Sequence, residues 1–342
     1  MSFDPAATRV IGHRGVTVSQ LGVGTLPFGS YAKSDTDASI GAAFSALCGA
    51  GLRYFDTAPL YGLGVAEHRL GACLRSVDRR SLVLSTKVGR LLQPVAGDSA
   101  PGVCSGASPF EIAFDYSYDG TLRSLEQSLQ RLGTNVVDIV LIHDVNRRWQ
   151  GDLVEQRYRE AMEGAHRALC DLRAAGTIKA FGVGVNDCDI LMRFAADGDF
   201  DCFMLAGRYT LLDHTALDRL MPECARRGIS VLMAAPFNSG ILATGARPGA
   251  TFFYAEAGHE IVERTRRIEA VCARHHIAIA AAALQFPLAH PAVASVVTGM
   301  RSKEEVVANL AHCHATISPD FWDELKRERL IAADAPVPSN WR

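Results

Sequence analysis

The chain has 342 residues, of which 48% are hydrophobic and 21% are charged, and its formal net charge is −2. This composition predicts a well-buried core and gives no electrostatic reason to expect nucleic acid or an anionic membrane as a partner. Its apolar runs are too short to span a bilayer, and its nine cysteines lie singly, without a C-x-x-C pair, as in cytoplasmic enzymes with reduced thiols.

The predicted elements begin with a short hairpin, formed by strands at 10–11 and 16–18 with Gly15 in its turn, and a core strand follows at 21–25. The first helix is capped by Asp35 or Thr36 and runs to Cys48. Apolar runs predict further strands at 53–56, 82–87, 137–142, 181–185, 203–206, 230–234 and 293–297. Helical spacing predicts further helices at 67–74, 118–132, 159–175, 190–196, 216–227, 260–275, 279–289, 302–311 and 319–331.

The regular alternation of strands and helices predicts a parallel sheet. Eight strands with no change of composition along the chain favour a single (β/α)8 barrel of the TIM type over residues 1–342, with an N-terminal hairpin and extra C-terminal helices. The first half has no Gly-x-Gly-x-x-Gly between a strand and a helix, which argues against a dinucleotide-binding doubly wound sheet.

Long irregular segments at 88–117, 146–158 and 236–258 interrupt this alternation. Structureless loops of this length are uncommon inside a compact domain unless they bind ligands or act as lids. We therefore expect substrate selection in these loops, with Trp149 and Asn238 as candidate substrate-binding residues.

Polar residues mark the ends of successive strands: Asp56, Lys87 and His143, with Tyr61 in the loop after the first of these strands. In a barrel of parallel strands these ends meet on one face. A lysine ammonium beside a phenol favours the phenolate and lowers the pKa of the phenol, and a paired carboxylate keeps the lysine charged. An imidazole can orient a substrate oxygen. The set predicts a proton-transfer site for the interconversion of alcohols and carbonyls, and the sequence shows no cluster of metal ligands.

These residues lie in motifs that resemble the aldo-keto reductase family. The motifs are Phe-Asp-Thr-Ala-x-x-Tyr-Gly at 55–62, Ser-Thr-Lys at 85–87 and Ile-His-Asp at 142–144. The resemblance implies a (β/α)8 barrel that binds NAD or NADP in an extended pose. It also implies that Asp56, Tyr61, Lys87 and His143 are catalytic, and that Tyr61 and His143 contact the substrate.

The resemblance also assigns a cofactor site. Asn186 would bond the nicotinamide carboxamide, Tyr209 would stack on the nicotinamide ring, and backbone N–H groups of 236–242 would bind the pyrophosphate. Residues 299–302 would hold the adenosine phosphate end at a helix N-terminus, and Glu305 and Asn309 would reach the adenine. The full set is Gly24, Thr25, Asp56, Asn186, Tyr209, Pro236, Phe237, Ser239, Gly240, Leu242, Gly299, Arg301, Ser302, Glu305 and Asn309.

Two segments, 205–212 and 236–240, are similar to the family's sugar dehydrogenases of the D-threo-aldose 1-dehydrogenase (L-fucose dehydrogenase) type, while Ala206 replaces a glutamine of many other members. This implies oxidation of an aldose at C1 to the lactone, with Tyr61 taking the proton. Oxidation of pyridoxal at C4, general aldehyde reduction and a cofactor-sensing channel subunit remain alternatives.

Overall fold

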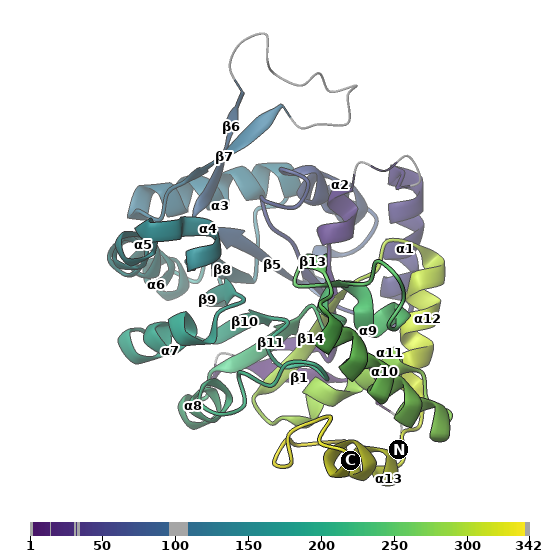
Figure 1. The fold of residues 1–342 in the computed structure, drawn as a ribbon. Coiled ribbons are helices and arrows are strands. Elements are labelled where there is room, and N and C mark those ends of the chain that lie inside the picture. The colour runs from purple at the N-terminus through teal and green to yellow at the C-terminus, as the bar shows by residue number, and fades with distance from the viewer. Residues whose placement is uncertain (1–2, 14, 31, 33–34, 96–108, 339–342) are drawn as a thin grey trace.

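A computed structural model describes residues 3–13, 15–30, 32, 35–95 and 109–338. Its centre is a closed barrel in which every neighbouring pair of strands is parallel, and β14 pairs with β3 to complete the ring (Figure 1). Around the ring the strands are β3 (Leu21–Gly24), β4 (Tyr54–Asp56), β5 (Val83–Val88), β8 (Ile139–His143), β9 (Ala180–Val185), β10 (Cys202–Ala206), β11 (Ser230–Ala234) and β14 (Val293–Gly299). The predicted barrel is confirmed.

Helices surround the barrel, and α12 packs beside α1 where the ring closes (Figure 1). They are α1 (Asp37–Gly49), α2 (Val65–Leu74), α3 (Tyr118–Leu132), α5 (Val154–Glu160), a π-helical segment (Ala161–His166), α6 (Arg167–Ala174), α7 (Cys188–Asp197), α8 (Leu220–Arg227), α10 (His259–Arg274), α11 (Ile279–Gln285), α12 (Lys303–His314) and the closing α13 (Pro319–Arg327). Thr36, Ser117, Asp187 and Ser302 cap helices through their side chains, as their residue types favour.

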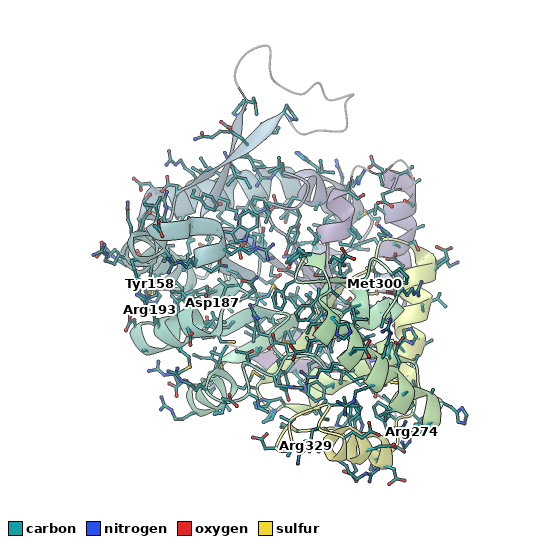
Figure 2. All side chains as sticks on the ribbon, viewed as in Figure 1. Tyr158, Asp187, Arg193, Arg274, Met300 and Arg329 are labelled. Carbon is teal, nitrogen blue, oxygen red and sulfur yellow. The ribbon has the colours of Figure 1, made fainter. Side chains whose placement is uncertain are left out.

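Side chains also join neighbouring helices on the outside of the barrel. Arg193 of α7 lies over the Tyr158 ring of α5, with its guanidinium carbon 4.0 Å from the ring centroid (Figure 2). The same guanidinium bonds the Glu155 carboxylate at 2.7 Å. Such a cation–π contact adds about 0.5–1 kcal/mol at an exposed site.

The N-terminal hairpin, β1 (Thr8–Ile11) and β2 (Val16–Ser19), closes the amino end of the barrel. Its buried Ile11, Val16 and Val18 belong to the cluster of side chains that fills the barrel interior. The Gly12 N–H in its turn donates to Ser230 Oγ at the start of β11 (2.9 Å). The working end of the barrel is therefore the opposite end, where the strands finish.

The three segments expected to be irregular contain regular structure. In the first, β6 (Arg90–Pro94) pairs with β7 (Phe110–Phe114) in an antiparallel hairpin that projects from the barrel (Figure 1); residues 96–108 lie outside the described residues. The second contains α4 (Arg147–Gln150) and the start of α5. The third contains η6 (Asn238–Gly240), α9 (Ile241–Thr244) and a hairpin of β12 (Thr251–Phe252) and β13 (Ala255–Glu256). Short strands stabilised by cross-strand contacts are poorly visible in local composition.

Candidate active site

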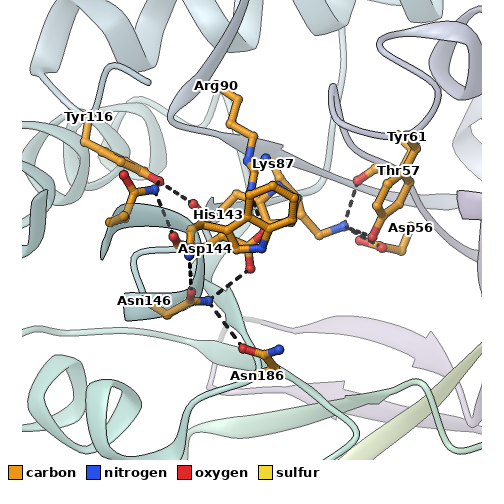
Figure 3. A network of polar contacts seen from close by, with 12 residues as sticks. Asp56, Thr57, Tyr61, Lys87, Arg90, Tyr116, His143, Asp144, Asn146 and Asn186 are labelled. Atoms are coloured by element: carbon orange, nitrogen blue, oxygen red, sulfur yellow. Dashed lines mark hydrogen bonds and ion pairs between the residues drawn. The ribbon is translucent and has the colours of Figure 1, made fainter. Parts of the chain in front are cut away.

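Asp56, Lys87 and Tyr61 meet at the carboxyl ends of β4 and β5 (Figure 3). Lys87 Nζ donates to Asp56 Oδ2 at 2.6 Å, to the Thr57 carbonyl at 2.9 Å and to Tyr61 Oη at 3.0 Å. Parallel neighbouring strands place these side chains together, since residues 54–56 pair in register with 83–85. The lysine thus uses all three of its N–H bonds, and one of them ends on the phenol oxygen.

A second layer of hydrogen bonds holds the carboxylate. Ser85 Oγ donates to Asp56 Oδ1 at 2.6 Å, and the Tyr54 hydroxyl lies 2.9 Å from the same Ser85 oxygen. Asp56, Ser85 and Tyr54 are all buried. Both carboxylate oxygens are therefore occupied, which compensates part of the large cost of burying this charge.

The titration of this group differs from the sequence-based expectation. Burial lowers the pKa of Lys87, but Asp56 and Tyr61 together outweigh it and the pKa rises to about 12. Burial raises the pKa of Tyr61 to about 12, although the Lys87 ammonium acts to lower it. The predicted fall in the Tyr61 pKa is therefore wrong for the protein alone, because desolvation of the phenolate exceeds the attraction of the lysine. Tyr61 carries its proton at neutral pH.

His143 ends β8, the next strand around the barrel. Its ring meets the Tyr61 ring edge to face, with centroids 6.4 Å apart, and its carbonyl accepts a hydrogen bond from the Tyr116 hydroxyl at 2.7 Å. Burial, reinforced by the Arg90 and Lys87 cations, holds the pKa of His143 well below its usual range. The imidazole is therefore neutral, so it can orient a substrate oxygen without adding a positive charge.

Three polar residues that the sequence reasoning missed complete the network: Arg90, Asp144 and Asn146. Arg90 Nη2 donates to Asp144 Oδ2 at 2.5 Å, and Asn146 Nδ2 donates to Asp144 Oδ1 at 3.4 Å (Figure 3). The signal for Asp144 was present in the Ile-His-Asp motif. Arg90 had no such signal, since it lies in a segment expected to be loop.

Trp149, a predicted substrate-binding residue, lies in α4, the short helix that Asn146 caps, and it packs on this network. The Arg90 guanidinium lies 4.4 Å from the centroid of the Trp149 ring, which is 43% exposed. The tryptophan thus covers the buried arginine and keeps one part of its ring in solvent. Trp149 therefore lies beside the polar network, and its contact with a substrate stays a prediction.

The two predicted nicotinamide contacts, Asn186 and Tyr209, have different surroundings in the structure. Asn186 Oδ1 accepts from Asn146 Nδ2 at 3.4 Å, and Asn186 lines a small cavity with Ala206, Gly207 and Ser239. Tyr209 is instead fully buried.

The Tyr209 ring packs on Phe286 with centroids 5.1 Å apart and meets His290 edge to face. Tyr209 therefore belongs to an aromatic cluster of the core, and we do not place it against a nicotinamide.

The predicted pyrophosphate loop uses several of its polar groups internally. The N–H groups of Gly240 and Leu242 both donate to the Phe237 carbonyl. Asn238, expected to contact substrate, is buried; its amide accepts from Thr210 Oγ1 at 2.5 Å and donates to the Gly207 carbonyl at 3.1 Å. The N–H groups of Gly240 and Leu242 are therefore used within the turn at η6. The expectation for Asn238 is corrected, because its buried side chain anchors the loop.

The β12–β13 hairpin folds back over this loop. Thr251 Oγ1 donates to the Ser239 carbonyl at 2.6 Å, and the Tyr254 N–H donates to Ser239 Oγ at 3.0 Å. Phe253 stacks on the Arg208 guanidinium at 4.0 Å, and it lines both the small cavity and a larger groove of about 510 Å³ over α7 and α8. Asn186 lines both spaces as well, so the two lie next to each other.

The remaining predicted cofactor residues lie where β3 and β14 end side by side. Gly24 pairs with Gly299, which is exposed, and Thr25 donates its N–H to the Asp56 carbonyl at 2.8 Å. Ser302 caps α12, and Glu305 and Asn309 follow on that helix. The buried Pro236 and the half-buried Phe237 lead from β11 into η6. The set therefore follows the mouth of the barrel from Asn186 to α12.

No group of His, Cys, Asp or Glu side chains suited to a metal ion occurs within the described residues. Across the same residues, none of the helices has both the length and the apolar character needed to cross a bilayer. The eight cysteines in the described ranges are free thiols.

Known proteins resemble this chain in sequence and in fold. A model of the aldo/keto reductase family matches residues 20–328. Pyridoxal 4-dehydrogenase from Microbacterium luteolum is 41% identical, covering 97% of this chain and 100% of its own length. D-threo-aldose 1-dehydrogenase from a Pseudomonas species is 35% identical, covering 96% and 98%. A solved aldo-keto reductase from Bacillus halodurans, in its holo form, has a TM-score of 0.74 at 22% identity over 96% and 97%, which supports the fold.

Proposed function

Because this chain belongs to the aldo/keto reductase family, we propose that it is an NAD(P)-dependent dehydrogenase that oxidises a cyclic hemiacetal to a lactone. Aldoses and pyridoxal share one chemical feature: each carries an aldehyde and a hydroxyl placed to close a ring. Relatives named for each of them are more than a third identical to the chain. The observation that carries the proposal is Tyr61 Oη lying 3.0 Å from Lys87 Nζ beside a neutral imidazole.

The described residues fit a nicotinamide cofactor at the barrel mouth. Among them, the buried hydroxyls of Thr25 and Thr57 have no hydrogen-bond partner, and a buried hydroxyl is normally satisfied. Both threonines follow barrel strands next to Asp56. They could bond the ribose of the cofactor, while Asn186 could hold its carboxamide. When bound, the nicotinamide supplies the acceptor for the hydride.

The protein's own groups manage the proton. The ionised Tyr61 oxygen takes the proton of the anomeric hydroxyl as the C–H electron pair leaves and the carbonyl forms. Lys87, held by Asp56 at 2.6 Å, stabilises the phenolate that must exist before this step. His143 donates an N–H to the same substrate oxygen and fixes its direction. Trp149 lies where it can pack on the ring of the substrate.

The substrate class is tested with purified protein, NAD or NADP, and a panel of L-fucose, D-arabinose, L-galactose and pyridoxal, with methylglyoxal as the reductive control. We expect oxidation of at least one hemiacetal and a product that is two hydrogens lighter by mass spectrometry. The higher identity makes pyridoxal the first compound to test. Faster reduction of simple aldehydes than oxidation of any hemiacetal would contradict the proposal. Cofactor binding without turnover of any substrate would favour a sensing role.

The raised pKa of Tyr61, about 12 in the protein alone, predicts the pH dependence. A general base acts in its deprotonated form, whose fraction grows about tenfold per pH unit below the pKa. We therefore expect kcat/KM for oxidation to rise from pH 7 to pH 10, and reduction to be flat or fall over the same range. The His143 pKa is lowered, so no break is expected near 6.5. Steady-state rates across this range in both directions check the prediction, and an oxidation rate that is independent of pH would contradict it.

The residues expected to hold the adenosine end of the cofactor predict a preference for NAD over NADP. Glu305 Oε2 accepts the Arg301 N–H at 2.9 Å and Oε1 accepts its Nε–H at 3.1 Å, while the Asp35 carboxylate lies 4.0 Å from Arg301 Nη1. These carboxylates neutralise the arginine and would repel a 2′-phosphate, whereas a carboxylate accepts a ribose 2′-hydroxyl well. We expect kcat/KM to favour NAD by about tenfold or more, the equivalent of about 1.4 kcal/mol.

The matched variant is Glu305→Gln, which keeps the size of the side chain and frees the charge of Arg301. It should narrow the preference for NAD mainly through a lower KM for NADP. An unchanged ratio would show that the 2′ position of the ribose lies elsewhere.

A further inference from the structure

Asp144 adopts a backbone conformation that few residues other than glycine use. Its φ is +55°, in the left-handed region, and its N–H donates to the Gly184 carbonyl at 3.0 Å where β8 turns away from β9. Such conformations cost free energy and persist where surrounding contacts impose them, often at functional sites. The bend turns the Asp144 side chain back toward the residue that precedes it.

The Asp144 carboxylate is fixed on several sides. Oδ2 accepts from Arg90 Nη2 at 2.5 Å, Oδ1 accepts from Asn146 Nδ2 at 3.4 Å, and Oδ2 also lies 3.3 Å from His143 Nε2 (Figure 3). Gln150 Nε2 donates to the Asp144 carbonyl at 3.1 Å. The carboxylate therefore faces the working nitrogen of the imidazole from a position it cannot easily leave.

Arg90 is itself held rigidly. It is completely buried, its guanidinium carbon lies 4.4 Å and 5.0 Å from the ring centroids of Trp149 and Phe114, and its carbonyl accepts from Ser124 Oγ at 3.1 Å. A buried guanidinium needs a negative partner, and the partner in turn is kept ionised. Burial raises the pKa of Asp144 and the Arg90 cation opposes this rise, so Arg90 holds the carboxylate in place and favours its charged form.

The two nitrogens of His143 have different surroundings. Nε2 lies 3.3 Å from the Asp144 carboxylate, whereas the buried Nδ1 has no hydrogen-bond partner among the described residues. A neutral imidazole carries one proton, and the nitrogen that faces the negative charge is the favoured place for it. The contact lacks the alignment of a hydrogen bond, so the Nε2–H remains able to donate to a substrate oxygen.

We propose that Asp144, secured by Arg90, is a positioning residue that keeps the proton of His143 on Nε2 and so provides the hydrogen bond that orients the substrate oxygen. The proposal rests on the function assigned above. An ion pair that only joined β6 to β8 would have no reason to face Nε2. A similar buried pair at the other end of β8, Arg79 Nη2 with Asp138 Oδ2 at 2.7 Å, provides the structural comparison.

The test compares Asp144→Asn with Asp138→Asn. Asp144→Asn removes the negative charge that faces Nε2, so the proton is no longer held there, and we expect kcat to fall about 10- to 100-fold with KM for the cofactor unchanged. This is less than the ~10²–10⁴-fold that a general acid–base group itself supplies. Asp138→Asn should lower the melting temperature and leave kcat within threefold. The double variant Arg90→Met/Asp144→Asn removes both buried charges, so that folding is preserved while the kcat defect remains. A kcat within threefold of the original in Asp144→Asn and in the double variant would overturn the proposal.

A mutant cycle separates positioning from direct contact with the substrate. In a His143→Ala background, Asp144→Asn should cause less than a threefold further loss, because no imidazole is left to position. A loss as large as in the original protein would overturn the proposal.

A measurement without turnover keeps this result distinct from failure of the proposed function. Protein labelled with nitrogen-15 histidine, with the His143 signals identified by their absence from His143→Ala, should show a protonated Nε2 and an unprotonated Nδ1. The pattern should reverse or mix in Asp144→Asn. The same pattern in both proteins would overturn the proposal whatever the substrate is.

Discussion

Tyr61→Phe is expected to reduce turnover by about 10²–10⁴-fold, the range that a general acid–base group contributes. The substitution removes one oxygen, the one that accepts from Lys87 Nζ at 3.0 Å, and leaves the ring beside His143. Cofactor affinity, followed by quenching of protein fluorescence, should be nearly unchanged.

Tyr158→Phe is the matched control. It removes a hydroxyl that donates to Asp197 Oδ2 at 2.6 Å on the outer helices, and it should retain normal kcat. A Tyr61→Phe enzyme that kept about a tenth of its activity would show that another group moves the proton.

Lys87→Met should cause the second large effect, on both activity and stability. Lys87 and Asp56 each have side chains that are 2% exposed, and burial already raises the pKa of Asp56 against the opposing effect of Lys87. Removing one partner of a buried pair typically costs about 3–5 kcal/mol, because the other charge is left without compensation. We expect a loss of unfolding free energy of this size, measured by denaturant titration, and a fall in kcat of at least about 10²-fold.

The double variant Asp56→Asn/Lys87→Met distinguishes the two effects. It leaves no unpaired charge, so most of the stability should return, while the phenolate still lacks its cation and activity should stay low. Recovery of activity together with stability would show that the pair serves folding alone. Failure of the stability to return would show that the loss comes from packing around residue 87.

The sequence predicted the strand-end cluster well because its logic is geometric. Asp56, Lys87 and His143 end strands that are neighbours in the barrel, β4, β5 and β8, so parallel pairing alone brings them together. Parallel pairing likewise brings Gly24, at the end of β3, beside Gly299, at the end of β14. Residues at strand ends can be placed without knowing any side-chain contact.

What the sequence could not show depends on long-range packing. The burial that raises the Tyr61 pKa is a property of the folded protein and has no signal in the local sequence. Tyr209 and Asn238 carry side chains typical of binding sites, yet one packs on Phe286 and the other anchors its own loop through Thr210. Arg90 lies in a hairpin that pairs it with Phe114, 24 positions further along the chain (114 minus 90), and local composition hides such a pairing.

Because the amino end of the barrel is closed, ligands can reach the site from one end only. Ile11, Val16 and Val18 close the amino end of the barrel. The site is therefore open only at the end where the strands finish. Substrate, product and coenzyme then enter and leave at the same end of the barrel. The rate of product release would therefore depend on the loops at the carboxyl end of the barrel.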